Sequence, residues 1–309
     1  MGRACLIRVR TLLFTFLLGC AGNSFDPTDP GKNDSVDDSG GVLAPGTLDV
    51  AWMHGSASCG QNTEPELQVH AYNATTHILR QNKCDTFEAP FIYVLAGTER
   101  ALIFDTGATA TATLRDTTRK LIGSRELVVT HSHAHGDHIA SDARFEGQPL
   151  TTVIGISRGA VQAAFGITSW PTGEGTIDLG DRVLDVLAIP GHEATSIALY
   201  DRQTGLLLTG DTLYPGLLFI NSWNEYRASI SRLARFVATH EVSHVLGAHV
   251  EMTATPKLNY EYGTTFQPDE HVLQLAPRHL AELDAKLTEL GSSTPSGSVP
   301  LDDFVIDPQ

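Results

Sequence analysis

The sequence has 309 residues, 41% of them hydrophobic, which is enough for one large folded domain with a substantial core. Its formal net charge is −15, from 21 basic and 36 acidic residues. Three of the basic residues precede position 20, so the remainder has 18 basic and 36 acidic residues, a charge of −18. A surface this acidic repels phosphate backbones, which argues against nucleic acid as a partner. With nucleic acid disfavoured, a small molecule is the expected partner.

Residues 1–19 have the order of a secretory signal peptide, with basic residues first and then the apolar run TLLFTFLLGC. That run is too short to span a bilayer as a stable helix. Its end, LLGC at Cys20, resembles the bacterial lipoprotein box, in which the cysteine is acylated. The resemblance implies an exported protein held to a membrane only by a lipid on Cys20, on the periplasmic or cell-surface side. A plain signal peptide cut after a small residue is the alternative.

Residues 20–48 are rich in Asp, Gly, Ser, Pro and Asn, and they hold too little apolar surface to offset the entropy of ordering them. They are expected to form a flexible tether. Beyond them, Cys59 and Cys84 are the two cysteines of the folded part. In an oxidising compartment the simplest expectation is a disulfide that closes a loop of about 26 residues and contributes roughly 3 kcal/mol. Two unrelated free thiols are the alternative.

Strand-like and helix-like segments follow one another through the expected folded domain, residues 49–291. The first strands are arranged in hairpins, and later strands alternate with helices, which predicts a layered α/β protein with more than one sheet. The Gly/Ser-rich sequence near the end predicts a loose tail at 292–309. Strands are expected at 66–73, 77–82, 91–97, 101–107, 126–130, 151–155, 183–189, 196–200, 206–210 and 242–247, and helices at 109–122, 157–165, 226–239 and 277–290.

The run THSHAHGDH, residues 130–138, places four histidines and one aspartate directly after the strand at 126–130. Imidazole nitrogens and carboxylate oxygens on such a loop can converge on a metal ion. The same order, a strand and then a ligand-type residue, recurs at His192, Asp211 and His249. Each of these has an ordinary explanation by itself, such as a turn or a cap, but the repetition favours a metal site at the strand ends.

These residues resemble the five-motif signature of the metallo-β-lactamase superfamily, with Asp105 of FDTG as the first motif. The resemblance covers roughly residues 66–260 and implies an αββα sandwich, two mixed β-sheets flanked by helices, with a binuclear metal site at one edge. It implies two divalent ions, for which zinc is expected and iron or manganese is possible chemically. By the same resemblance, His133, His135 and His192 hold one ion, Asp137, His138 and His249 hold the other, Asp211 bridges them, and Asp105 orients ligands by hydrogen bonds.

The spacing His-x-His-x-Asp-His fixes which histidines of the run match the family. Only Asp137 is followed directly by a histidine, so counting back assigns His135 and His133 and leaves His131 outside the motif. A structural role near the strand end is expected for His131, with contact to a ligand or substrate as the alternative.

The expected chemistry is hydrolysis, in which a metal-bridging hydroxide attacks an ester, lactone or thioester and Asp137 helps to orient the water. Tyr214 is the candidate hydrogen-bond donor to the developing negative charge, because lactone-hydrolysing members of the superfamily carry a tyrosine three residues after the bridging aspartate. An aromatic side chain that only packs in a loop is the alternative for Tyr214. The sequence is most similar in pattern to the glyoxalase II and lactonase group.

Two other functions stay open at this point. One is a metal-containing lipoprotein that binds a ligand or partner without turnover. The other is β-lactam hydrolysis, although zinc β-lactamases do not use an aspartate as the bridging ligand, so Asp211 argues against it as the main activity.

Overall fold

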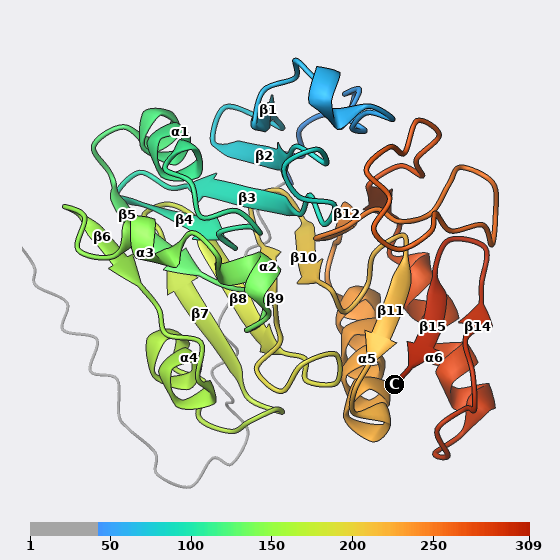
Figure 1. Ribbon diagram of the computed structural model, residues 1–309. Coiled ribbons are helices and arrows are strands. Elements are labelled where there is room, and N and C mark those ends of the chain that lie inside the picture. Colours follow the sequence, from blue (N-terminus) through green and yellow to red (C-terminus); the bar gives the residue numbers. More distant parts are fainter. Residues whose placement is uncertain (1–42) are drawn as a thin grey trace, which may run out of the picture. The chain divides into compact units, whose positions relative to one another are not determined.

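The computed structural model describes residues 43–309, so the expected signal peptide, Cys20 and most of the expected tether lie outside the described residues. Figure 1 shows two six-stranded sheets with helices beside them. No helix within residues 43–309 is both long enough and apolar enough to cross a membrane.

The first sheet has the strand order β1-β2-β3-β4-β5-β6. Strands β1 to β4 form an antiparallel meander, and β4, β5 and β6 run parallel. Helix α1 (Thr113–Ile122) makes the crossover that a parallel connection requires. The strands are β1 (Leu67–Ala71), β2 (Thr76–Gln81), β3 (Phe91–Ala96), β4 (Arg100–Phe104), β5 (Glu126–Thr130) and β6 (Thr151–Val153).

The second sheet has the order β13-β12-β10-β9-β8-β7, with β10 and β12 parallel and the other pairs antiparallel. The long helix α5 (Trp223–Thr239) connects β10 to β12 by way of β11. The strands of this sheet are β7 (Glu174–Asp178), β8 (Val183–Ala188), β9 (Ile197–Asp201), β10 (Leu206–Gly210), β12 (His244–Gly247) and β13 (Gln274–Leu275), and the other helices are η1 (Cys59–Gln61), α2 (Gly136–Ile139), α3 (Asp142–Phe145), α4 (Arg158–Phe165) and α6 (Arg278–Leu290).

Three hydrophobic clusters divide the protein into layers. The central cluster joins the facing sides of the two sheets, for example Leu102 of β4 and Leu199 of β9. A second cluster packs the outer face of the second sheet against α5 and α6, and a third packs the outer face of the first sheet against α1 and α3. Burial of this apolar surface on both faces of both sheets is the main stabilising contribution. The order of layers is therefore helix, sheet, sheet, helix, and the expected αββα sandwich is confirmed.

Helices α5 and α6 are amphipathic, with buried residues every three or four positions, which is why they lie flat on the sheet. The expected helix at 226–239 begins earlier, at Trp223, whose buried ring packs in the same cluster. Helix α6 starts directly after Pro277 and ends at Gly291, whose φ of 78° only glycine adopts at little cost.

The end of the sequence differs from the expected loose tail at 292–309. Strands β14 (Val299–Pro300) and β15 (Val305–Pro308) form a three-stranded sheet with β11 (Leu217–Ile220). Phe304 and Ile306 are buried in the cluster under α5 and α6. Their burial stabilises the end of the chain, although the Gly/Ser-rich segment before β14 contributes little apolar surface. The parallel pairing of β15 with β11 crosses more than eighty residues, so no local pattern predicted it.

The expected tether at 20–48 also ends earlier than its predicted boundary. The backbone N–H groups of Ala44 and Thr47 donate to the carbonyl oxygens of Gln203 and Tyr72, and Leu48 packs against the central cluster. Residues 44–48 therefore belong to the folded domain. The disulfide expected between Cys59 and Cys84 is present, and it joins the N-terminal segment of the domain to the loop after β2.

Candidate metal centre

Seven side chains of the sequence pattern meet at one edge of the two sheets. Each comes from a loop or short helix that follows a buried strand, so the rigid sheets set the positions of the loops. The loop after β5 and helix α2 carry four of them, and the segments after β8, β10 and β12 carry one each. They are His133, His135, Asp137, His138, His192, Asp211 and His249.

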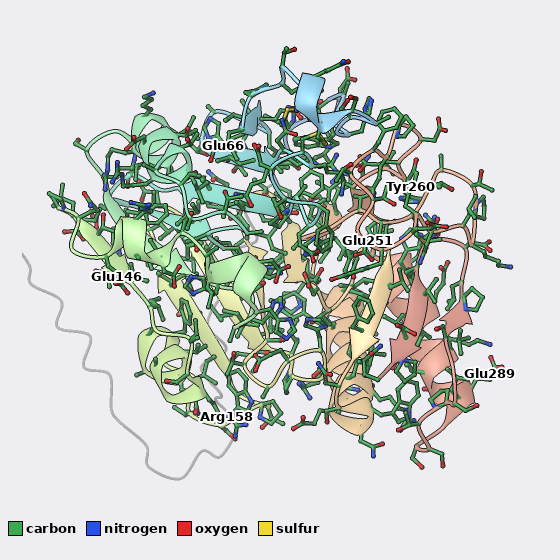
Figure 2. All side chains as sticks on the ribbon, in the orientation of Figure 1. Glu66, Glu146, Arg158, Glu251, Tyr260 and Glu289 are labelled. Atoms are coloured by element: carbon green, nitrogen blue, oxygen red, sulfur yellow. A yellow bond between two sulfur atoms is a disulfide. The ribbon has the colours of Figure 1, made fainter. Side chains whose placement is uncertain are left out.

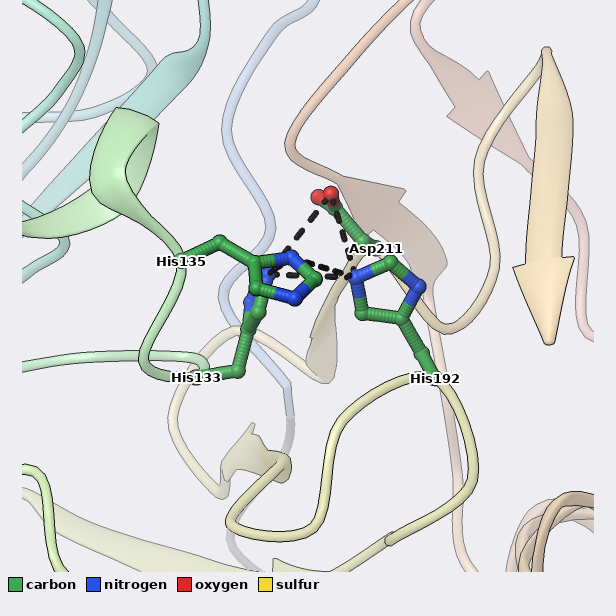
Figure 3. Close-up of side chains that lie close together, drawn as sticks. All are labelled: His133, His135, His192 and Asp211. Atoms are coloured by element: carbon green, nitrogen blue, oxygen red, sulfur yellow. Dashed lines mark hydrogen bonds and ion pairs between the residues drawn. The ribbon is translucent and has the colours of Figure 1, made fainter. Parts of the chain in front are cut away.

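The first cluster contains His133, His135, His192 and Asp211, whose side chains converge from separate segments in Figure 3. His192 Nε2 lies 3.2 Å from His133 Nε2 and 3.1 Å from His135 Nδ1, and the last two nitrogens are 2.9 Å apart. Asp211 Oδ2 lies 3.8 Å from His133 Nε2 and 3.6 Å from His192 Nε2. Ligands of a tetrahedral zinc ion lie about 3.3 Å apart, so this spacing suits one ion.

The second cluster contains Asp137, His138, Asp211 and His249. Asp137 Oδ2 lies 3.3 Å from His138 Nε2 and 3.4 Å from His249 Nε2. Asp211 Oδ1 lies 3.4 Å from each of the same two nitrogens. Asp211 thus faces the first cluster with one oxygen and the second cluster with the other, as a bridging carboxylate would.

Hydrogen bonds on the far side of three rings direct their Nε2 lone pairs into the clusters. His192 Nδ1 donates to the carbonyl oxygen of Phe219, and His249 Nδ1 donates to that of Glu88. His138 Nδ1 donates to Asp105 Oδ2 at 2.9 Å. Each of these hydrogen bonds keeps the proton of the neutral ring on Nδ1. The lone pair is then on Nε2, which is the form that binds a metal ion.

Asp105 is buried and has a positive φ of 75°, which is unusual for a residue other than glycine. Besides His138, its carboxylate accepts from the backbone N–H and the hydroxyl of Ser132. The loop that carries Ser132 can approach β10 because residue 210 is a glycine. A Cβ atom at Gly210 would lie 2.4 Å from the Cβ of Ser132. The backbone strain at Asp105 is therefore held in place by contacts that orient a ligand histidine.

The residues present fit a pair of cations. The Nε2 atom of His138 and Oδ1 of Asp211 are buried and have no hydrogen-bond partner among residues 43–309. The two atoms lie 3.4 Å apart, in ion-pair range but without a hydrogen bond, so a cation between them would supply the contact that each of them lacks. Imidazole nitrogens together with carboxylate oxygens are also the donor set that zinc, iron and manganese share.

Electrostatics in the centre point the same way. Burial alone would lower the pKa of His249, but the carboxylates of Asp211 and Asp137 outweigh it and raise the pKa to about 9. Burial opposes ionisation of Asp211 as well, yet the surrounding histidines hold its pKa well below the ordinary value. The carboxylates therefore stay ionised and attract positive charge at the positions that metal ions would take.

Two other residues of the sequence pattern lie outside the ligand clusters. His131 is buried, and its Nε2 lies 2.8 Å from Asp142 Oδ1, so it has the expected structural position near the strand end. Tyr214 contributes to the wall of the pocket, but its hydroxyl donates to the carbonyl oxygen of Leu217 and lies 3.2 Å from Glu251 Oε2. This arrangement favours the packing alternative for Tyr214, and the role of its hydroxyl as a donor to substrate stays a prediction.

The metal clusters open into a pocket of about 350 Å³. Sequence reasoning missed several residues of its wall, because their positions depend on long-range packing. Glu251 lies beside the start of β11 (Figure 2), where it accepts from the backbone N–H of Leu217. Gln309 lies at the other end of that strand, where its backbone N–H donates to the carbonyl oxygen of Ile220. The missed wall residues are Glu88, Phe219, Asn221, Glu251, Tyr262 and Gln309.

An αββα sandwich with two carboxylate-histidine clusters at one edge defines a superfamily of metal-binding proteins. Residues 85–242, just over half of the chain, match the metallo-beta-lactamase superfamily, and the protein belongs to it. The chain is 29% identical over 189 residues to the acyl-coenzyme A thioesterase MBLAC2 of Bos taurus, an alignment that covers 48% of this chain and 65% of the relative. It is 28% identical over 168 residues to a hydroxyacylglutathione hydrolase of Synechococcus sp., covering 52% of this chain and 63% of the relative.

The chain thus matches less than two thirds of the length of these curated relatives. Among solved structures, a metallo-beta-lactamase from Pontibacter korlensis superposes with a TM-score of 0.50 at 16% identity, covering 72% of this chain and 99% of the other. At that identity the likeness concerns the fold alone.

Proposed function

We propose that the protein is a hydrolase that requires two divalent metal ions and acts on a carboxylic ester, lactone or thioester. The observation that carries the proposal is the pair of ligand clusters that share Asp211, in which His138 Nε2 and Asp211 Oδ1 are buried without a hydrogen bond to any described residue. The names of the thioesterase and hydroxyacylglutathione hydrolase relatives support the thioester option. Zinc is the proposed metal because five imidazoles outnumber the two carboxylates, and iron and manganese are the alternatives.

Each residue has a distinct part in the proposed reaction. His133, His135 and His192 would hold one ion, Asp137, His138 and His249 the other, and Asp211 both. When bound, the ions would supply a water of lowered pKa and polarise the bond under attack. The carboxylate of Asp137, which lies at the pocket wall, would accept a hydrogen bond from that water and orient it toward the substrate.

The proposal is tested with metal-free and zinc-loaded protein on a panel of lactones, thioesters and aryl esters. The expected result is zinc-dependent turnover of at least one class, lost in His133→Ala and Asp137→Ala. Arg115→Ala is a matched control because Arg115 lies on α1, away from the ligand clusters, and within residues 43–309 its side chain pairs with its exposed neighbour Asp116 alone. Turnover that persists without metal, or that both variants retain, would contradict the proposal.

The same metal-loaded protein tests two alternative functions, a non-catalytic metal-containing lipoprotein and a β-lactam hydrolase. If the loaded protein binds metal but hydrolyses no compound of the panel, a non-catalytic metal-containing lipoprotein is the better description. Hydrolysis of the β-lactam nitrocefin at the rate of dedicated lactamases would instead identify a β-lactam hydrolase.

We also propose that the protein is exported and anchored to a membrane by a lipid on Cys20. The sequence of the first twenty residues supports this, and the Cys59–Cys84 disulfide is typical of an oxidising compartment. Cys20→Ala should release the protein from the membrane fraction in a producing bacterium. An unchanged membrane fraction would overturn the lipid anchor.

A further inference from the structure

The wall of the metal pocket contains acidic and aromatic side chains but neither lysine nor arginine, within the described part of the chain. An anionic group of a substrate would therefore find no ammonium or guanidinium group there, since the imidazoles of the wall belong to the ligand clusters. This property separates the pocket from one built for a phosphate-bearing carrier, which needs basic partners.

Glu88 is the wall residue whose carboxylate is free. Its backbone carbonyl oxygen accepts from His249 Nδ1, which fixes the residue beside the metal centre. Within residues 43–309 its side chain has no hydrogen bond or ion pair, although it lines the pocket. The neighbouring carboxylate, Glu251, differs because it accepts from the backbone N–H of Leu217 at 2.9 Å and is buried.

Two aromatic rings lie beside Glu88. Phe87 and Tyr262 meet edge to face with their centroids 5.0 Å apart, and Tyr262 is 78% exposed. Tyr262 and Glu88 line the same pocket and the same crevice, and the carboxylate of Glu88 raises the pKa of Tyr262, with smaller contributions from burial and from Asp137. A carboxylate beside exposed aromatic faces is a recurring environment for organic cations.

A narrow crevice continues from the pocket past Glu88, Glu251 and Tyr262. It reaches Gln267, which is 4% exposed and whose Oε1 has no hydrogen-bond partner among the described residues. That oxygen is an acceptor in need of a donor. Lys83 also lines the crevice, and its ammonium donates to the carbonyl oxygen of Phe87. Burial lowers the pKa of Lys83 to about 8, and the Glu88 carboxylate attracts the ammonium without forming an ion pair.

We propose that Phe87, Glu88 and Tyr262 form a subsite for an ammonium group of the substrate, beside the metal centre. The free carboxylate supplies the charge, the two rings supply cation–π contact, and the crevice offers Gln267 Oε1 to an N–H group. The proposal narrows the substrate class of the proposed hydrolase and rests on that function for turnover, but the subsite itself predicts binding without it.

The test compares a cation with a neutral molecule of the same size, first in binding and then in turnover. Benzylamine and benzyl alcohol are titrated into the zinc-loaded full chain by calorimetry. Hydrolysis of 4-(aminomethyl)phenyl acetate, 4-ethylphenyl acetate and 4-(carboxymethyl)phenyl acetate is then followed by release of the phenol, with each rate divided by its uncatalysed rate. Glu88→Gln removes the charge and keeps the backbone contact to His249.

Glu146→Gln is the matched control, since this exposed glutamate follows α3, far from the pocket in Figure 2. In the parent protein the cation is expected to bind, and to be hydrolysed, about tenfold better than its neutral counterpart, with the anion least favoured. Glu88→Gln should reduce the cation-to-neutral ratio to near one, whereas Glu146→Gln should leave it unchanged.

Equal binding of benzylamine and benzyl alcohol, or a ratio that Glu88→Gln leaves intact, would overturn the subsite. If the cation binds selectively but no ester is hydrolysed, the subsite stands and the proposed hydrolase fails. The two proposals can therefore fail separately.

Discussion

Two regions of this protein hold buried charges in different ways. The guanidinium of Arg182 and the carboxylate of Asp201 are each 1% exposed, and they pair at 2.6 Å. The remaining donors of Arg182 reach the carbonyl oxygens of Thr75 and Ala96 and the hydroxyl of Thr76. In the metal centre, by contrast, His138 Nε2 and Asp211 Oδ1 are buried without a hydrogen-bond partner in residues 43–309.

The difference teaches how a structural ion pair can be distinguished from a metal site. The pair of Arg182 and Asp201 is complete by itself, because every charge has an opposite charge and hydrogen bonds inside the protein. The metal centre brings three imidazole nitrogens within 3.2 Å of one another, which is the spacing of ligands around one ion. Both regions are buried and charged; they differ in whether the protein itself supplies a hydrogen-bond partner to each buried polar atom.

The largest effect is expected when the shared ligand is removed. Asp211→Ala takes one carboxylate from both clusters, so bound metal should fall and ester hydrolysis should decrease roughly a thousandfold or more, since groups that only orient ligands already cost 10–100-fold. Elemental analysis of the folded variant and steady-state kinetics measure this. Full metal content in Asp211→Ala would show that Asp211 is not needed to hold the ions, and would contradict the proposed metal site.

Breaking the structural pair should have the opposite pattern. Arg182→Leu leaves the Asp201 carboxylate buried without its partner, and the free energy of unfolding should fall by about 3–5 kcal/mol. Bound metal per folded molecule should stay the same. Urea unfolding measures the loss, and Lys286→Ala, which removes a surface ion pair with Glu289 on α6, should change stability by less than about 0.5 kcal/mol. Loss of metal from folded Arg182→Leu would contradict the separation.

Lys83 is a buried charge of a third kind, since burial lowers its pKa to about 8 and its one hydrogen bond goes to a backbone oxygen. Its pKa is lower in the folded than in the unfolded chain, so the unfolded chain binds more protons between pH 8 and 10.5. Stability should therefore rise with pH in this window, by an order of 2–3 kcal/mol. Lys83→Met should remove the rise in urea unfolding; an identical pH profile in the variant would refute it.

A smaller effect is expected at the residue that orients a ligand. Asp105→Asn keeps a side chain that tolerates positive φ but weakens the hydrogen bond to His138, so metal affinity should fall about 10–100-fold. Competition with a coloured chelator measures the affinity. An unchanged affinity would mean that Asp105 only stabilises the loop.

The ligands could be predicted from the sequence because each follows a strand of obvious pattern, as His133 follows β5 and Asp211 follows β10. The αββα layers followed from the same pattern together with the resemblance. The sheet of β11, β15 and β14 could not be predicted, because its stabilisation comes from contacts such as that of Ile306 with the distant cluster under α5.

Residues that complete the pocket wall depended on the same long-range packing. Glu88 lies in a loop without a recognisable motif, and only the fold places its carbonyl oxygen against His249. Tyr214 was identified from its spacing to Asp211, but that spacing does not reveal that Leu217 and Glu251 engage its hydroxyl. Spacing along the chain therefore predicted which residues meet, and not which of their atoms remain free.

The central claim is that two ions bind in clusters joined by Asp211 and that hydrolysis depends on them. Titration of the metal-free full chain with zinc, with bound metal and aryl ester hydrolysis measured on the same samples, tests it most directly. The account predicts saturation at two zinc ions per chain and hydrolysis that appears only as the sites fill. Saturation at one ion or none, or hydrolysis at full rate before zinc is added, would contradict it.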